Sequence, residues 1–227
     1  MTAFVFATGN PDKAREVCEI FTAARGATMA AGPIVAADGA IVGFAVAPID
    51  AIDSFIASIA VPDIAPDVTE SGATLLDNAR IKACAVANAL GVPAVGDDTG
   101  LEIDALGGEP GVFSARYAGV DATYADNCAK VLNAMAEKRR ASRTARFVTI
   151  ALWCEPLTGD ECFARGVAEG VIVDECRGEN GFGYDPVFAP AGGAGRTFAE
   201  MTASEKHSIS HRGRAFRVLA ATLDERL

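Results

Sequence analysis

The stretch TLLDNARIKACAVANALGVPAVGDDTGL, residues 74–101, decides the fold. Thr74 and Asp77 have a spacing similar to that of a capping box, and the apolar repeat of helical period that follows them stops at Gly91. An apolar run over residues 92–96 comes next and is typical of a buried strand. We therefore predict a helix followed at once by a strand, and that strand ends at a pair of acids.

A strand, a loop and a helix also open the chain. Residues 3–7 form a short apolar run, and residues 8–12 interrupt it before a second repeat of helical spacing begins. Asn10 can cap that helix, and Pro11 suits its first position. The free backbone N–H groups of the loop then lie at the positive end of a helix.

Strands and helices are mixed along the rest of the chain. We expect an α/β fold with a long mixed β-sheet flanked by helices, in a single domain over residues 1–227 with two lobes and a central cleft. The further elements predicted are strands over residues 101–106, 147–153 and 166–173, helices over 124–138 and 213–227, and strands with a short helix between 26 and 66.

The composition excludes several classes of protein. The chain has 227 residues, of which 50% are hydrophobic, and this composition argues against disorder. Its net charge of −10 argues against a nucleic acid polymer as partner. The longest strongly apolar run, residues 39–49, is too short to span a membrane, and no secretory signal is visible. We expect a cytoplasmic protein with no membrane partner. The six cysteines form no CxxC pair and are predicted to be reduced thiols that hold no zinc.

The common phosphate-loop, dinucleotide, nucleophile-elbow and HExxH signatures are absent, so polar clusters at the ends of apolar runs carry the chemistry. Thr8, Asn10 and Lys13 form the first cluster, at a helix N-terminus suited to anionic oxygens. Alternatively, Thr8 and Asn10 only cap the helix, and Lys13 is solvated.

A second cluster contains Glu70, Asn78 and Lys82. Asn78 and Lys82 are four residues apart, roughly opposite the apolar stripe of their helix, so both can point into one cleft. A solvated polar face is the simpler interpretation when this pattern is taken alone.

The adjacent acids Asp97 and Asp98 form the sharpest feature. Their carboxylates repel, and burying them is costly unless a cation or hydrogen-bond donors compensate, so a metal ion is the economical explanation. Neighbouring strand residues point to opposite faces, so a shared site requires the backbone to turn here, which Thr99 and Gly100 permit. An acidic turn capped by Thr99 is the structural alternative.

Two clusters follow in the C-terminal third. Residues 181–186, GFGYDP, place an aromatic ring between glycines beside a carboxylate, which suits stacking on a base but is equally consistent with a rigid turn. Lys206, His211 and Arg212 lie in a stretch typical of caps and turns, and we expect them to supply hydrogen bonds and charge rather than bind a metal.

These motifs occur in the order seen in one family: FATGNPDK (6–13), ESGAT (70–74), NARIKA (78–83), GDDTGL (96–101), GGEPGVFSARYAG (107–119), GFGYDP (181–186) and SHRG (210–213). Over residues 3–215 the chain resembles the inosine/xanthosine triphosphate pyrophosphatases. The resemblance implies a house-cleaning hydrolase that converts non-standard purine nucleoside triphosphates such as ITP, dITP and XTP to the monophosphate and pyrophosphate. It also implies Mg²⁺ as cofactor and a homodimer.

The resemblance assigns roles to individual residues. It implies that Asp98 accepts a proton and binds the metal ion together with Glu70 and Asp97, while Lys82 lies beside the phosphates. Thr99 stands where the family commonly has Ser. The phosphate-binding residues implied are Thr8, Gly9, Asn10, Pro11, Asp12 and Lys13, and the base pocket implied consists of Phe182, Gly183, Tyr184, Asp185, Lys206, His211 and Arg212.

One departure and three rival functions stay open. The segment over residues 26–66 is longer than the resemblance leads us to expect. A pyrophosphatase of related fold for pyrimidine or modified nucleotides, an NTPase that cleaves the terminal phosphate, and a nucleotide-binding sensor without hydrolysis all fit parts of the pattern. An acidic pair beside a triphosphate disfavours the sensor.

Overall fold

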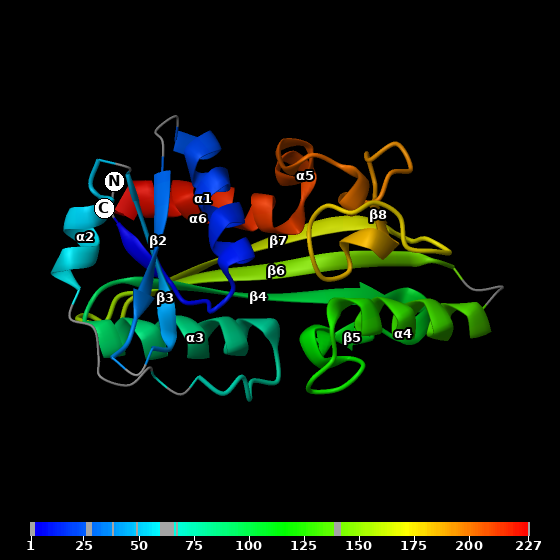
Figure 1. Ribbon diagram of the computed structural model, residues 1–227, viewed down its shortest axis with the longest axis horizontal. Coiled ribbons are helices and arrows are strands. Elements are labelled where there is room, and N and C mark those ends of the chain that lie inside the picture. The colour runs from blue at the N-terminus through cyan, green and yellow to red at the C-terminus, as the bar shows by residue number, and fades with distance from the viewer. Residues whose placement is uncertain are drawn as a thin grey trace. The chain divides into compact units, whose positions relative to one another are not determined.

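The computed structural model describes residues 3–25, 29–37, 39–48, 50–59, 66, 68–138 and 142–226. Within these ranges it contains a mixed sheet with the strand order β2-β3-β1-β4-β6-β7-β8, and β5 pairs with β4 (Figure 1). β1 pairs parallel with β4 and antiparallel with β3, so the predicted mixed sheet is confirmed. The strands are β1 (Phe4–Phe6), β2 (Met29–Val35), β3 (Ile41–Pro48), β4 (Ala94–Ile103), β5 (Pro110–Gly111), β6 (Thr144–Cys154), β7 (Glu161–Ile172) and β8 (Phe188–Pro190).

Helices flank the sheet, as predicted. They are α1 (Pro11–Arg25), α2 (Ile52–Ser58), α3 (Leu75–Leu90), α4 (Tyr124–Glu137), α5 (Ala203–Ile209) and α6 (His211–Arg226). None of the described helices is both long enough and apolar enough to cross a membrane.

The described chain divides into two compact units. The first comprises residues 1–98, 150–165 and 215–227, and the second comprises residues 99–149 and 166–214. β4, β6 and β7 each contribute residues to both units. The central cleft and the single domain stay predictions.

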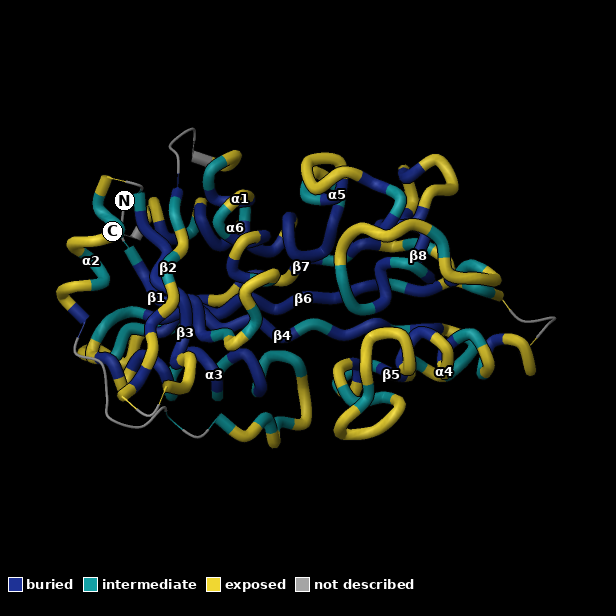
Figure 2. Tube along the Cα trace, viewed as in Figure 1, coloured by how far each residue is buried: buried dark blue, intermediate teal, exposed yellow. Residues whose placement is uncertain are grey.

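The core of the first unit has two layers, one on each face of its strands. Phe4 and Phe6 of β1 pack in a cluster with residues of α1 and α6, whereas Val5 packs in a cluster with α3 and α2. This alternation follows from the two-residue period of a strand. Both layers are visible in Figure 1, and Figure 2 shows that the strand interiors are buried while the connecting loops are exposed.

The second unit has a core of its own, built from the remaining halves of the long strands. Leu101 and Ile103 of β4 pack there with Val131 and Met135 of α4. Phe198, from the segment after β8, is completely buried in the same cluster. α4 begins as a capped helix, because the Thr123 hydroxyl accepts a hydrogen bond from the backbone N–H of Asp126 and the Asp126 side chain accepts one in return.

The sequence signals around α3 are confirmed. Thr74 and Asp77 make a capping box, and Gly91 ends the helix in the left-handed conformation that glycine favours. Gly96 lets β4 pass close to this helix, since a Cβ atom there would collide with the carbonyl oxygen of Ala79.

Three expectations from the sequence are wrong. β4 does not turn after Gly96 but continues as one strand through the acids to Ile103, and Leu101 and Ile103 anchor its second half in the core of the second unit. Asn78 and Lys82 do not lie opposite the apolar stripe of α3 but are buried beside it. The stretch 204–213, interpreted as caps and turns, contains the helix α5, whose N-cap Thr202 makes a capping box with Glu205.

The long segment between α1 and α3 is predicted to contain strands and a short helix. Its described residues form two strands and one helix. β2 and β3 pair antiparallel, and β3 also pairs with β1 along the edge opposite β4. The helix α2 follows β3 in the chain. Residues 26–28, 38, 49, 60–65 and 67 of this segment lie outside the described residues.

Candidate active site

The loop before α1 both caps the helix and leads to a lysine that is engaged in an ion pair. The side-chain oxygen of Asn10 accepts hydrogen bonds from the backbone N–H groups of Asp12 and Lys13, so Asn10 is the cap of α1. The Thr8 hydroxyl accepts a hydrogen bond from the backbone N–H of Asn10. Lys13 is not merely solvated, because its Nζ atom lies 3.3 Å from Oδ1 of Asp97.

A cavity in the first unit contains this ion pair. Its volume is about 340 Å³, and Lys13, Lys82, Glu70 and Asp97 contribute to its lining. The loop residues Thr8 and Gly9 and several apolar side chains complete the wall: Ala7, Ile41, Val42, Pro66, Val68 and Val86. Two cations and two anions thus face one hollow at the N-terminus of a helix, an arrangement that can accept phosphate oxygens and a divalent ion.

Asp98 joins this site through Lys82. The Lys82 Nζ atom lies 3.0 Å from Oε1 of Glu70 and 3.2 Å from Oδ1 of Asp98. The Asn78 amide donates a hydrogen bond to the second oxygen of Asp98 at 3.1 Å. Residues 78 and 82, one turn apart on α3, therefore hold both oxygens of a single buried carboxylate.

The two acids leave β4 on opposite faces, because the strand does not turn. Asp97 pairs with Lys13 of α1, and Asp98 pairs with Lys82 of α3. Asp97 is 1% exposed and Asp98 is 8% exposed, so each carboxylate is compensated by a lysine, as burial of charge requires. A backbone turn, which the sequence analysis required for a shared site, is absent from this strand. Lys13 and Lys82 instead approach the two acids from opposite faces of β4.

The site shifts the pKa values of its buried groups. Burial raises the pKa of Asp98, the attraction of Lys82 opposes that rise, and the charges of Glu70 and Asp97 add to it. Burial alone would lower the pKa of Lys82, but the charges of Asp98, Asp97 and Glu70 outweigh burial and raise it. Lys82 is therefore a permanent cation, and Asp98 is a carboxylate with more affinity for a proton than an exposed aspartate.

These acids fit a hard divalent ion by their chemistry. Glu70, Asp97 and Asp98 offer only oxygen ligands, which Mg²⁺ prefers. In the described chain these carboxylate oxygens do not surround one point as a complete set of metal ligands would. Lys13 binds Asp97, and Lys82 binds Asp98. Mg²⁺ commonly keeps several waters and uses one or two carboxylates together with substrate phosphates, so a complete protein cage is not required.

A second polar site is built in the second unit around Phe182. The Phe182 backbone N–H donates to Oδ2 of Asp185 at 2.9 Å, and the Lys206 ammonium donates to the same oxygen at 2.7 Å. Lys206 also lies over the Phe182 ring, 4.9 Å from its centroid. One buried carboxylate thus fixes both an aromatic loop and a cation above its ring.

Arg212 is the second cation at this ring. Its guanidinium carbon lies 5.5 Å from the Phe182 centroid, and its Nη2 atom donates a hydrogen bond to the Thr99 hydroxyl at 3.2 Å. The neighbouring His211 is buried and stacks on Phe147, with ring centroids 4.4 Å apart. Lys206 and Arg212 thus both lie over the Phe182 ring, and their role in binding a base stays a prediction.

Tyr184 has a structural position within this loop. It is buried, and its hydroxyl donates a hydrogen bond to the carbonyl oxygen of Ser114. Gly183 precedes it with φ +65°, so the loop reverses here and sends the Phe182 and Tyr184 rings to different surroundings.

Two side chains near these sites were missed by sequence reasoning. Tyr124 lies beside Phe182, with ring centroids 6.1 Å apart, and Thr149 shares a hydrogen bond of 2.7 Å with Thr99. No spacing links these residues to their partners, because both contacts join separate elements.

The arginines at positions 139, 140, 143 and 146 form a basic run after α4, and the two that the structure describes make ion pairs. Arg146 makes ion pairs with Glu102, Asp104 and Glu169, and Arg143 pairs with Asp174. The other two arginines of the run, at positions 139 and 140, lie outside the described residues.

Comparison with known proteins gives consistent similarities. The model of the Ham1 family matches residues 4–222. The dITP/XTP pyrophosphatase of Syntrophobacter fumaroxidans is 48% identical over 163 residues, which cover 70% of this chain and 67% of the relative. The dITP/XTP pyrophosphatase of Thermus thermophilus is 50% identical over 151 residues, covering 66% of this chain and 71% of the relative. The structure of the Staphylococcus aureus Ham1 protein matches 98% of both chains with a TM-score of 0.70 and 32% identity.

Proposed function

The chain belongs to the Ham1 family, and from that membership we propose that it hydrolyses non-standard purine nucleoside triphosphates such as ITP, dITP and XTP. The products are the nucleoside monophosphate and pyrophosphate. The arrangement of Lys82 between Asp98 and Glu70, beside the Lys13–Asp97 pair, carries this proposal. It combines cations for phosphates with carboxylates for a divalent ion and for a proton.

The triphosphate is assigned to the cavity of the first unit. Lys13 and Lys82 neutralise phosphate oxygens, and the backbone N–H groups of the loop from Thr8 to Lys13 add donors at a helix N-terminus. Asn10 contributes by shaping the loop, since its own side chain is engaged as the cap of α1.

Asp98 is assigned the proton-accepting role. It takes the proton from the water that attacks the α-phosphorus, and Asn78 holds the carboxylate in place for that task. A pKa raised by burial favours such a base. Glu70, Asp97 and Asp98 would hold Mg²⁺ as the cofactor, which would lower the pKa of water and neutralise phosphate charge.

The base is assigned to the second unit, at Phe182. The ring offers a stacking surface for any base, while Lys206, Arg212 and His211 supply donors. A 6-oxo group accepts hydrogen bonds, whereas the 6-amino group of adenine donates them, so buried donors favour hypoxanthine and xanthine. Sites that leave buried polar groups unpaired with the wrong ligand can discriminate by about 10⁴.

We further propose that the protein is cytoplasmic and forms a homodimer, as the family resemblance implies.

A substrate panel tests the proposed activity. The purified protein is incubated with ITP, XTP, dITP, GTP and ATP in the presence of Mg²⁺, and pyrophosphate and orthophosphate are quantified separately. We expect pyrophosphate from ITP, dITP and XTP at a far higher kcat/KM than from ATP. Release of orthophosphate would identify an NTPase for the terminal phosphate, and tight binding without either product would identify a nucleotide sensor.

A further inference from the structure

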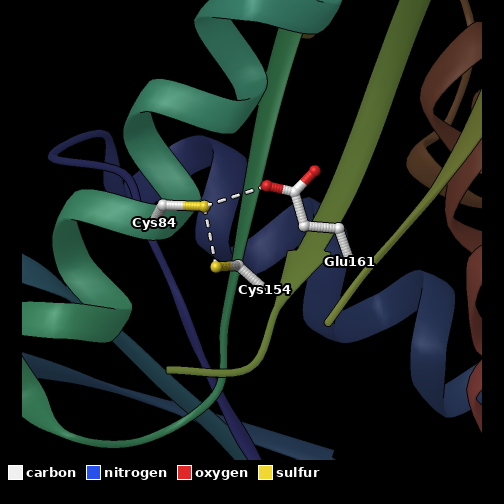
Figure 3. Close-up of side chains that lie close together, drawn as sticks. All are labelled: Cys84, Cys154 and Glu161. Atoms are coloured by element: carbon white, nitrogen blue, oxygen red, sulfur yellow. Dashed lines mark hydrogen bonds between the residues drawn. The ribbon is translucent and has the colours of Figure 1, made fainter. Parts of the chain in front are cut away.

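Three side chains outside the proposed reaction lie together in the first unit. Cys84 on α3, Cys154 at the end of β6 and Glu161 at the start of β7 place their ligand atoms within 4.8 Å of one another (Figure 3). The Cys84 Sγ atom lies 2.7 Å from Sγ of Cys154 and 3.4 Å from Oε1 of Glu161. The fold thus gathers two thiols and a carboxylate from three elements, although no sequence spacing links them.

We propose that Cys84, Cys154 and Glu161 bind one thiophilic divalent ion of the zinc type. Two thiolates and a carboxylate form a donor set that such ions accept, and a water can complete a tetrahedral site. Cys154 is buried, while the other two ligands are partly exposed, so an ion can reach the site from solvent. The expectation from sequence that these cysteines hold no zinc rested on the absence of CxxC pairs, which does not exclude a site assembled by the fold.

Arg80 supports the site from outside the ligand set. Its Nε atom donates to Oε2 of Glu161 at 2.8 Å, which leaves Oε1 directed toward Cys84. A hydrogen bond that orients a ligand in this way is a common feature of metal sites. The charge is also balanced, because one divalent ion together with Arg80 neutralises two thiolates and one carboxylate.

A disulfide is the competing outcome for two sulfurs this close. Burial, the neighbouring sulfur and the charge of Glu161 raise the pKa of Cys84, and burial also raises the pKa of Cys154. Oxidation and metal binding both require thiolates, and a bound divalent ion itself stabilises the thiolates that these surroundings disfavour. A divalent ion is also attracted by the negative charge of the Glu161 carboxylate. To bind it at about 2.3 Å, the two sulfurs move apart to about 3.8 Å in tetrahedral geometry.

The ion has a structural role in this proposal. It ties α3 to the connection between β6 and β7, and Cys84 lies only two residues after Lys82 on that helix. Binding to the folded state alone raises the melting temperature in proportion to the logarithm of ion concentration.

Cobalt spectroscopy tests the site without relying on turnover. Reduced protein is freed of metal with a chelator and titrated with Co²⁺, and the sulfur-to-cobalt charge-transfer absorption is recorded. We expect the band to saturate at one Co²⁺ per chain and to disappear when Zn²⁺ is added. The carboxylates of the candidate active site cannot produce this band, because they contain no sulfur.

Variants separate this site from other thiols. Cys84→Ser and Cys154→Ser should abolish the band, whereas the matched control Cys176→Ser, an exposed cysteine in the second unit, should keep it. Glu161→Gln retains both sulfurs and should weaken Co²⁺ binding at least tenfold, and Arg80→Gln should weaken it about 10- to 100-fold. These two variants keep the test decisive if a serine variant fails to fold.

Two results would overturn the proposal. One is the absence of a sulfur-to-cobalt band in wild-type protein whose six thiols all react with a thiol reagent after denaturation. The other is two fewer reactive thiols in protein purified without reductant, restored by a reductant but accompanied by no metal binding after reduction, which would show a disulfide instead.

Discussion

The ammonium nitrogen of Lys82 on α3 lies 3.2 Å from Oδ1 of Asp98 on β4, a residue 16 positions further along the chain. The same nitrogen lies 3.0 Å from Glu70, so a single buried cation holds two carboxylates in place. Together with the ion pair of Lys13 and Asp97, this relationship explains how the adjacent acids Asp97 and Asp98 can exist within a packed strand. It also makes the charge state of Asp98 depend on Lys82.

Asp98→Asn should lower turnover of ITP by two or more orders of magnitude, because it removes the proposed proton acceptor while keeping the shape of the side chain. The measurement is kcat with ITP and Mg²⁺, together with a thermal melt that shows the fold is retained. Asp160→Asn, at an exposed aspartate in the turn after β6, is the control and should keep wild-type turnover. Turnover of Asp98→Asn within threefold of wild type would remove Asp98 from the proposed role.

Lys82→Met should destabilise the protein, because it leaves Asp98 and Glu70 without their common cation. Breaking a buried ion pair by removing one partner costs about 3–5 kcal/mol. The measurement is the free energy of unfolding in urea, and Lys138→Met, at an exposed lysine just after α4, is the matched control with little expected effect. Equal stability of the two variants would show that Lys82 does not compensate the acids.

Phe182→Ala should reduce kcat/KM for ITP, XTP and ATP by similar factors. Stacking of a base on an aromatic ring is worth about 1–3 kcal/mol and does not depend on the base, so a loss of roughly tenfold to hundredfold is expected for each substrate. Phe163→Ala, at an exposed ring on β7, is the control. A loss confined to ITP and XTP would instead make Phe182 a source of selectivity.

The sequence predicts the parts of this fold whose signals are local. The capping box of α3, the cap of α1 and the strand content of the long segment before α3 depend on residues within a few positions of one another. The continuous course of β4 could not be predicted in this way, because Asp97 and Asp98 are tolerated in a strand only through Lys13 and Lys82. Those lysines come from two other elements.

The same distinction applies to the sites. Phe182 and Asp185 are close in the sequence, and a motif identifies them together. The contact of Tyr124 with Phe182 and the cluster of Cys84 with Cys154 arise only from packing of distant elements, so no pattern in one sequence indicates them.

Glu205→Gln tests the pH dependence of stability. Hydrogen bonds from Arg196 and from the Thr202 cap lower the pKa of Glu205 from 4.5 to about 2. A carboxyl group with a depressed pKa in the folded state stabilises it above the unfolded pKa, and this contribution is lost as the pH falls through the folded pKa. We therefore expect wild type to melt at a higher temperature than Glu205→Gln near pH 6, and the difference to vanish between about pH 4.5 and about pH 2. A difference that is constant over this range would show that the ionised carboxylate is not responsible.

Gly181 and Gly183 form a matched pair for testing how the Phe182 loop is built. Both have positive φ, at +75° and +65°, but a Cβ atom at Gly181 would collide with the carboxylate of Asp185, whereas a Cβ atom at Gly183 meets no atom within 4 Å. Gly183→Ala should therefore lose only about 1 kcal/mol from backbone strain. Gly181→Ala should lose at least about 1 kcal/mol more, because it also displaces the oxygen that binds Lys206 and the Phe182 backbone. Urea unfolding of the two variants measures the difference, and equal losses would mean that Asp185 does not hold the loop.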